Sequence, residues 1–268
     1  MAWKLYALTF RVKAPLHIGK RKIGNLMQTY PYVTGRTMWG ALTAAITRKK
    51  YSNPEKEKFK KVGEMLFPSY FYVTEGPQKG PGFPWNDPDH FSYKFLDVRA
   101  AIATEGGAKT AAEGMLYQSE FIAPYTREGK PVYLTGYLAT EEKEENLREW
   151  IRRIQVGGEL SYGWGILELH ELHGENALWG EWKPNFERRK ISKLTFTKTG
   201  GNHHRNVALA HVCALEEGSA IEPKGRAEPL VVWEMGKLKY LGVFYPPGGQ
   251  LPSSIEKIQV DRYGFWYL

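Results

Sequence analysis

The stretch that decides the fold is residues 131–172, PVYLTGYLATEEKEENLREWIRRIQVGGELSYGWGILELHEL. Its first apolar run, residues 132–138, predicts a strand. A helix follows, for which Thr140 is the predicted N-cap. The predicted buried stripe of this helix comprises Leu147, Trp150, Ile151 and Ile154. Glycines crowd residues 157–165, and the run 166–172 predicts a second strand. The stretch is therefore expected to form strand, helix, glycine loop and strand.

The residues on the N-terminal side supply the other half of the pattern. Residues 3–13 alternate between two faces as a strand does, and residues 36–50 carry apolar side chains at helical spacing. Residues 55–66 predict a second, short helix. With a further strand near residues 95–103, the order becomes β-α-β-β-α-β. We therefore expect an α+β protein with a ferredoxin-like (RRM-like) module.

The predicted organisation has two parts. Residues 1–174 are expected to form the ferredoxin-like module, with an insertion at about residues 75–94 that offers turns but no periodicity. Residues 175–268 contain predicted strands at 194–198, 207–214 and 230–233. These strands either complete a second, degenerate β-rich and RRM-like module or extend the first sheet.

Charge indicates the class of partner. The 268 residues include 37 Lys and Arg against 29 Asp and Glu, and no acidic residue occurs between Met1 and Asn53. This distribution favours polyanion binding by the N-terminal region over a merely solvated edge. No stretch approaches the roughly 18 apolar residues of a membrane span, and the start resembles no signal peptide, so we expect a cytoplasmic protein without a membrane partner. Cys213 is the only cysteine, which excludes an internal disulfide.

The glycine loop, residues 157–165, is the strongest local signal for binding. Its candidate RNA-binding residues are Gly157, Gly158, Ser161, Tyr162, Gly163, Trp164 and Gly165. Bare backbone N–H groups can approach phosphates, and aromatic rings offer faces on which bases stack. No Lys-Ser or Lys-Thr follows the glycines, so the loop is not a P-loop, and it precedes a strand rather than a helix, unlike a dinucleotide fingerprint. The alternative is that the glycines only cap the helix and turn the chain.

Four ordered blocks over residues 15–165 resemble the RAMP superfamily of CRISPR-associated proteins. The blocks are PLHIG at 15–19, PYVTGRTMWGAL at 31–42, Val98-Arg99 with GMLY at 114–117 and Glu120, and the glycine loop. The third block is similar to a segment of the Cas7-like and Cas5-like subunits of type III effector complexes. The resemblance implies RRM-like domains, binding of guide RNA (crRNA) and of target RNA, and assembly with Cas10-like and Cas7-like subunits in antiviral defence.

The resemblance also bears on which subunit this is. Type III Cas7-like subunits carry an Asp between the first two blocks that is associated with metal-dependent cleavage of target RNA. Here residues 20–30 contain no Asp or Glu, whereas a metal at a scissile phosphate needs carboxylate oxygens. This favours a non-catalytic Cas5-like subunit of the Csm4, Cmr3 or Csx10 kind over a Cas7-like one. We expect Lys20, Arg21, Lys22, Arg36 and the glycine loop to bind the guide, with no metal or other cofactor.

Two other functions stay open at this point. A Cas6-like endoribonuclease would process precursor guide RNA without a metal, and His17 is the candidate acid or base. A His in this block also occurs in superfamily members that do not cut. A scaffold for an acidic protein partner would use the same basic faces, but it needs no aromatic glycine loop. We expect binding without catalysis.

Overall fold

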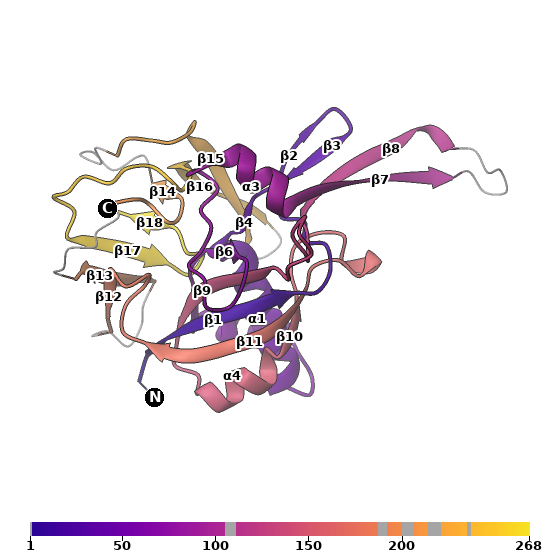
Figure 1. The fold of residues 1–268 in the computed structure, drawn as a ribbon. Coiled ribbons are helices and arrows are strands. Elements are labelled where there is room, and N and C mark those ends of the chain that lie inside the picture. The colour runs from indigo at the N-terminus through magenta and orange to yellow at the C-terminus, as the bar shows by residue number, and fades with distance from the viewer. Residues whose placement is uncertain (1, 105–110, 187–191, 200–205, 214–220, 235–236) are drawn as a thin grey trace.

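The computed structural model describes residues 2–104, 111–186, 192–199, 206–213, 221–234 and 237–268 (Figure 1). The described residues form three sheets with helices packed beside them, so the α+β prediction is confirmed. No helix in the described part of the chain has the length and apolar character needed to cross a bilayer.

The central sheet carries the decisive stretch. Its strands are β1 (Lys4–Val12), β4 (Tyr32–Val33), β5 (Leu66–Pro68), β6 (Phe71–Thr74), β9 (Tyr133–Thr140), β10 (Arg153–Gln155) and β11 (Ile166–Glu175). Their order is β10-β11-β1-β9-β6-β4, and β5 also pairs with β9. β1 lies in the middle, antiparallel to both β9 and β11. The strands predicted at residues 3–13, 132–138 and 166–172 are thus neighbours in one sheet.

Three helices accompany this sheet: α1 (Gly35–Lys50), α2 (Lys56–Gly63) and α4 (Glu144–Trp150). α1 packs against α4, α2 and β10, behind the sheet in the view of Figure 1. Thr34 caps α1, because its side chain accepts a hydrogen bond from the Thr37 N–H. Met38, Leu42 and Ile46 are buried, as the helical spacing predicts. The predicted helix at 36–50 is confirmed, whereas the one predicted at 55–66 ends at Gly63 and Leu66 already belongs to β5.

The helix in the decisive stretch begins later than predicted. Lys143, not Thr140, is the N-cap of α4, and Thr140 is the last residue of β9. Pairing explains the shift, since Thr140 lies opposite Lys4 of β1 and Leu66 of β5. Its hydroxyl accepts the Glu142 N–H in the turn that follows. Ile154, predicted on the helix, is a buried residue of β10.

A second sheet projects from the body, and we call it the arm (Figure 1). It consists of β2 (Gly19–Ile23), β3 (Leu26–Thr29), β7 (Leu96–Thr104) and β8 (Ala111–Ile122), in the order β2-β3-β8-β7. The strand predicted near residues 95–103 is β7, but its assignment to the same sheet as β1 is wrong. β8, which was not predicted, pairs with β7 over most of its length, and β6 occupies the place expected for β7 beside β9.

The segment expected as a surface insertion at about residues 75–94 is largely exposed, but buried aromatic residues anchor it to the body. It contains helix α3 (Pro88–Phe95), which starts with an Asp-Pro pair. Asp87 caps α3 by accepting the His90 N–H, and Pro88 occupies the first position, where a missing N–H costs nothing. Phe83, Phe91 and Phe95 are buried. A segment that was predicted to offer only turns therefore includes a helix.

The C-terminal residues form a separate seven-stranded sheet rather than an extension of the first. Its strands are β12 (Trp182–Asn185), β13 (Lys193–Lys198), β14 (Val212–Cys213), β15 (Glu228–Glu234), β16 (Lys237–Tyr245), β17 (Lys257–Asp261) and β18 (Trp266–Tyr267). Their order is β12-β13-β17-β18-β14-β16-β15. One buried apolar cluster is shared by both parts of the chain, and the Tyr72 hydroxyl donates to the Leu209 carbonyl across them at 2.8 Å.

A buried carboxyl at the end of β17 gives a pH-dependent contribution to stability. Asp261 Oδ1 accepts the N–H groups of Tyr263 (2.9 Å) and Phe265 (3.0 Å), while burial raises the pKa of Asp261 from 3.8 to about 6. The native carboxyl therefore holds its proton more tightly than the unfolded one. This contribution is complete below about pH 4 and is lost as the pH rises through 6. At about 1.4 kcal/mol per pH unit, it amounts to up to about 3 kcal/mol.

Asp261→Asn is expected to remove this pH dependence, because the amide oxygen still accepts both N–H groups but does not ionise. Urea unfolding of the wild-type protein and the variant between pH 4 and pH 7 measures the effect. The variant should gain stability relative to the wild type as the pH rises. A difference in unfolding free energy that stays constant over this range would contradict the prediction.

Candidate nucleic-acid interface

The glycine loop is built against the end of β1. Gly158 N–H donates to the His17 carbonyl at 2.9 Å, and Gly165 N–H donates to the Pro15 carbonyl at 2.7 Å. Gly157 and Gly165 have positive φ angles of 88° and 73°. A Cβ at Gly157 would lie 2.3 Å from the His17 carbonyl oxygen. The N–H groups of Gly158 and Gly165 are therefore used inside the protein and are not free for phosphates.

The tip of the loop is open. Residues Leu160–Tyr162 form one turn of 3-10 helix, and Ser161 and Gly163 beside Tyr162 are exposed. The Tyr162 side chain is 73% exposed. Gly163 has a φ of 79°, but no atom lies within 4 Å of where its Cβ would be. The part of the loop that a ligand can reach is this tip.

The two aromatic residues of the loop differ in their surroundings. Trp164 is only 6% exposed, and its ring packs edge to face on Phe121 with 5.1 Å between centroids. Both Trp164 and Tyr162 line a pocket of about 270 Å³ beneath the arm, together with Arg99, Tyr117, Ser119 and Glu159. Of the two rings, only that of Tyr162 offers a largely open face.

The basic residues after β1 lie on β2, the edge strand of the arm. All five residues of β2 are exposed. Arg21 Nε donates to Gln28 Oε1 at 2.7 Å, and Lys20 Nζ lies 5.7 Å from the centroid of the Tyr30 ring. Among the described residues, neither these two cations nor Lys22 forms a salt bridge. Their charges are available to an anionic ligand.

The arm divides these cations between its two faces. Pairing across the sheet places on one face, in order, Lys22, Met27, Ser119 and Arg99. This is the face of the pocket that contains Tyr162. Lys20 and Arg21 line a larger pocket, which Glu120 of β8 also lines. Lys22 is therefore the β2 cation that lies on the same face of the arm as Arg99 and the pocket lined by Tyr162.

Arg36 has a different environment from the other predicted cations. It is half-buried on α1, and its guanidinium donates to the Val231 carbonyl of β15. This contact ties α1 to the C-terminal sheet. This contact was not predictable from local sequence patterns, because 195 residues separate the two partners.

His17 sits where the first strand, the arm and the glycine loop meet. Its ring is 7% exposed, and its Nδ1–H donates to the Glu120 carbonyl at 2.6 Å. The Glu120 carboxylate in turn accepts the Thr29 N–H at 2.9 Å. The side chain of His17 is therefore fixed by β8, and its carbonyl is fixed by Gly158.

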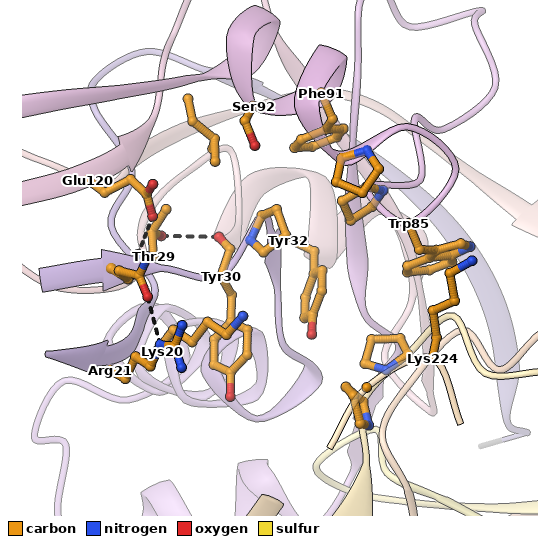
Figure 2. Close-up of a pocket in the computed structure, with 18 of the residues that line it drawn as sticks. Lys20, Arg21, Thr29, Tyr30, Tyr32, Trp85, Phe91, Ser92, Glu120 and Lys224 are labelled. Atoms are coloured by element: carbon orange, nitrogen blue, oxygen red, sulfur yellow. Dashed lines mark hydrogen bonds between the residues drawn. The ribbon is translucent and has the colours of Figure 1, made fainter. Parts of the chain in front are cut away.

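The larger pocket has a volume of about 670 Å³ and lies between the arm, α3 and the C-terminal part of the chain (Figure 2). Most of the residues that line it were not predicted from the sequence. They include Gln28, Thr29, Tyr30, Tyr32, Trp85, Phe91, Ser92, Leu96, Glu120, Lys224, Arg226, Glu228, Pro246 and Pro247. Segments as distant as residues 20 and 247 form its walls, so no local motif could have indicated it.

A hydrogen-bonded network lies at one side of this pocket. The Tyr30 hydroxyl donates to Glu228 Oε2 at 2.7 Å, and the Tyr70 hydroxyl is 2.7 Å from His211 Nδ1. His211 Nε2 is 3.7 Å from Glu228 Oε2. Burial raises the pKa of Tyr30 and lowers the pKa of His211. The pKa of Glu228 is lowered, mainly by its interaction with His211 and to a smaller extent by the hydrogen bond from Tyr30. A neutral imidazole thus faces an ionised carboxylate at neutral pH.

Comparison with known proteins identifies the family. The model of the RAMP superfamily matches residues 9–168. No curated protein matches the sequence. A chain of the type III-B Cmr-beta complex bound to cognate target RNA and AMPPnP is similar at 14% identity and a TM-score of 0.49, over 94% of this chain and 86% of that one.

A chain of the Cmr-beta complex bound to cognate target RNA is similar at 12% identity and a TM-score of 0.38, over 62% of this chain and 96% of that one. A chain of the apo Cmr-beta complex is similar at 11% identity and a TM-score of 0.38, over 62% of this chain and 96% of that one. The superfamily match includes the end of the first strand, the whole basic strand and the glycine loop, and it spans more than half of the 268 residues. The chain belongs to the RAMP superfamily.

Proposed function

We propose that this protein is a guide-RNA-binding subunit of a type III CRISPR effector ribonucleoprotein, Cas5-like and without catalytic activity. The observation that carries the proposal is the superfamily match over residues 9–168, which contains both the basic edge strand β2 and the glycine loop. Cas10-like and Cas7-like subunits and target RNA are the partners in this proposal, and antiviral defence in the cytoplasm is the setting.

The central sheet supports a ferredoxin-like module in a modified form. Along the chain the elements run β1, α1, β6, β9, α4 and β11, and in the sheet the four strands lie in the order β11-β1-β9-β6. These elements support a β-α-β-β-α-β module in which β6 takes the position predicted for the strand near residues 95–103. The arm is then an addition made of two insertions, with β2 and β3 between β1 and α1, and β7 and β8 between β6 and β9.

The guide is proposed to cross the base of the arm. Lys22 and Arg99 are exposed on the face that Tyr162 adjoins, so phosphates can be held by the cations while a base stacks on the tyrosine ring. Tyr162 is the better stacking candidate of the loop, since Trp164 is packed on Phe121. The loop glycines contribute by placing this tip, and not by presenting free amides.

A binding role is favoured over cleavage by two features. Residues 20–30 contain no carboxylate to hold a metal against a phosphate. The His17 ring is buried and hydrogen-bonded to the Glu120 carbonyl, whereas a general acid or base must reach the substrate. These features disfavour a cleaving Cas7-like subunit and a Cas6-like nuclease.

The full-length protein can be tested with labelled single-stranded RNA that carries a CRISPR repeat-derived 5′ tag. Fluorescence anisotropy should show binding roughly tenfold tighter than to duplex DNA of the same sequence, because stacking on Tyr162 requires unpaired bases. Gel analysis after incubation with Mg²⁺ or with EDTA should show intact RNA. Equal affinity for both nucleic acids would contradict the proposal. RNA cleavage that His17→Ala abolishes would favour the Cas6-like alternative.

A further inference from the structure

The geometry points to a second RNA contact, which rests on the proposed function and lies on the other face of the arm. We propose that the 670 Å³ pocket of Figure 2 takes one unstacked nucleotide of the bound strand. Its base would lie against Trp85. Its phosphates would lie between two pairs of cations, Lys20 with Arg21 and Lys224 with Arg226. The volume is in the range of about 300–1,000 Å³ that small-ligand pockets have.

The aromatic wall is held in place before any ligand arrives. The Trp85 ring stacks on Phe83 with 4.9 Å between centroids and 17° between planes, and it meets the Tyr72 ring edge-on at 5.5 Å. Gly248 lies against it so closely that a Cβ there would be 2.8 Å from the indole. Trp85 nevertheless remains half-exposed and lines the pocket. A ring fixed in this way loses little conformational entropy when a base stacks on it.

The charge of the pocket suits a phosphodiester. Four cations and two carboxylates line it. Both carboxylates have partners within the chain, since Glu120 accepts the Thr29 N–H and Glu228 accepts the Tyr30 hydroxyl. Within the described residues, none of the four cations forms a salt bridge. At formal charges the four cations exceed the two carboxylates by two, so the pocket has a net positive charge that is open to an anion.

Part of the pocket wall comes from residues outside the segment that matches the superfamily. The family match ends at residue 168, whereas Lys224, Arg226 and the Pro246-Pro247 wall lie beyond it. The pocket exists because the C-terminal part packs against the arm and α3. The hydrogen bond from the Tyr30 hydroxyl to Glu228 stabilises that packing, and Glu228 lies only two residues after Arg226 in the sequence. Uncharged donors and acceptors, Gln28 and Ser92, also line the pocket and can meet a base edge.

The test uses the full-length protein and single-stranded RNAs that each carry one 2-aminopurine, moved stepwise along the strand. Stacking on Trp85 should quench the fluorescence strongly at one position. The double variant Lys224→Ala/Arg226→Ala should abolish that quenching and weaken binding about tenfold, with a salt slope shallower by up to about 1.4. Both residues are exposed, so the fold should be unaffected.

The matched control is Lys49→Ala/Arg153→Ala. It removes the same charge from a different pocket, formed by α1 and β10, and should keep the position-specific quenching. If the wild-type protein binds RNA but no position is quenched, or if Lys224→Ala/Arg226→Ala behaves like this control, the pocket inference is wrong and the proposed function stands. If the wild-type protein binds none of the RNAs, both are wrong.

Discussion

Gly165→Ala is expected to destabilise the protein by about 3 kcal/mol or more. Gly165 has a φ of 73°, a conformation that costs an L-residue about 1–2 kcal/mol. In addition, its Cβ would lie 1.9 Å from the Val156 carbonyl oxygen. Because that obstacle is backbone, the loop must move, and the hydrogen bond from Gly165 N–H to the Pro15 carbonyl is then lost. Urea unfolding followed by tryptophan fluorescence measures the loss.

Gly163→Ala is the matched control for this prediction. Gly163 has nearly the same φ, 79°, but its Cβ would meet no atom within 4 Å. It should lose only the conformational part, about 1–2 kcal/mol, and should remain folded. Equal losses for the two variants would contradict the view that residues 157–165 are a structural support with an open tip.

The triple variant Lys20→Ala/Arg21→Ala/Lys22→Ala is expected to weaken RNA binding on the order of 100-fold at 0.1 M salt. Each phosphate contact to a single strand contributes about 0.7 to the slope of log K against log salt, so three contacts contribute about 2. The fold should be retained, since β2 is an exposed edge strand. Anisotropy titrations at several salt concentrations give both the affinity and the slope.

A control with the same change in net charge separates local contact from bulk charge. Lys56, Lys60 and Lys61 are exposed on α2, which packs against α1, and their replacement by alanine removes three positive charges as well. We expect this variant to bind RNA almost as the wild type does. A loss of affinity and slope equal to that of the β2 variant would mean that the arm is not the RNA contact.

The parts of the fold that were predictable from the sequence depend on short-range patterns. α1 follows from apolar residues at helical spacing, β1 from alternation, and β9 and β11 from short apolar runs on either side of a helix. The start of α4 was misplaced because Thr140 can cap a helix or end a strand, and only the partners Lys4 and Leu66 decide between the two. The Asp-Pro start of α3 was a readable signal that a turn interpretation obscured.

The candidate site was predictable only in part, for a physical reason. The exposure of Lys20, Arg21 and Lys22 was predictable from their charge, but the edge strand β2 that carries them was expected to be a loop. The packing of Trp164 on Phe121 and the engagement of Arg36 by β15 depend on contacts between distant segments. The same is true of the larger pocket, where Tyr30 meets Glu228 across 198 residues. Sequence periodicity contains no information about which distant segments meet.

Purification of the protein from its native host, followed by sequencing of the RNA that accompanies it, tests the central claim most directly. We predict RNAs that share one CRISPR repeat-derived tag at their 5′ ends and differ in the sequence that follows, together with other effector subunits. The variant Lys20→Ala/Arg21→Ala/Lys22→Ala should recover much less of this RNA. Recovery of no RNA, or of bulk cellular fragments without a shared tag, would contradict a guide-binding role.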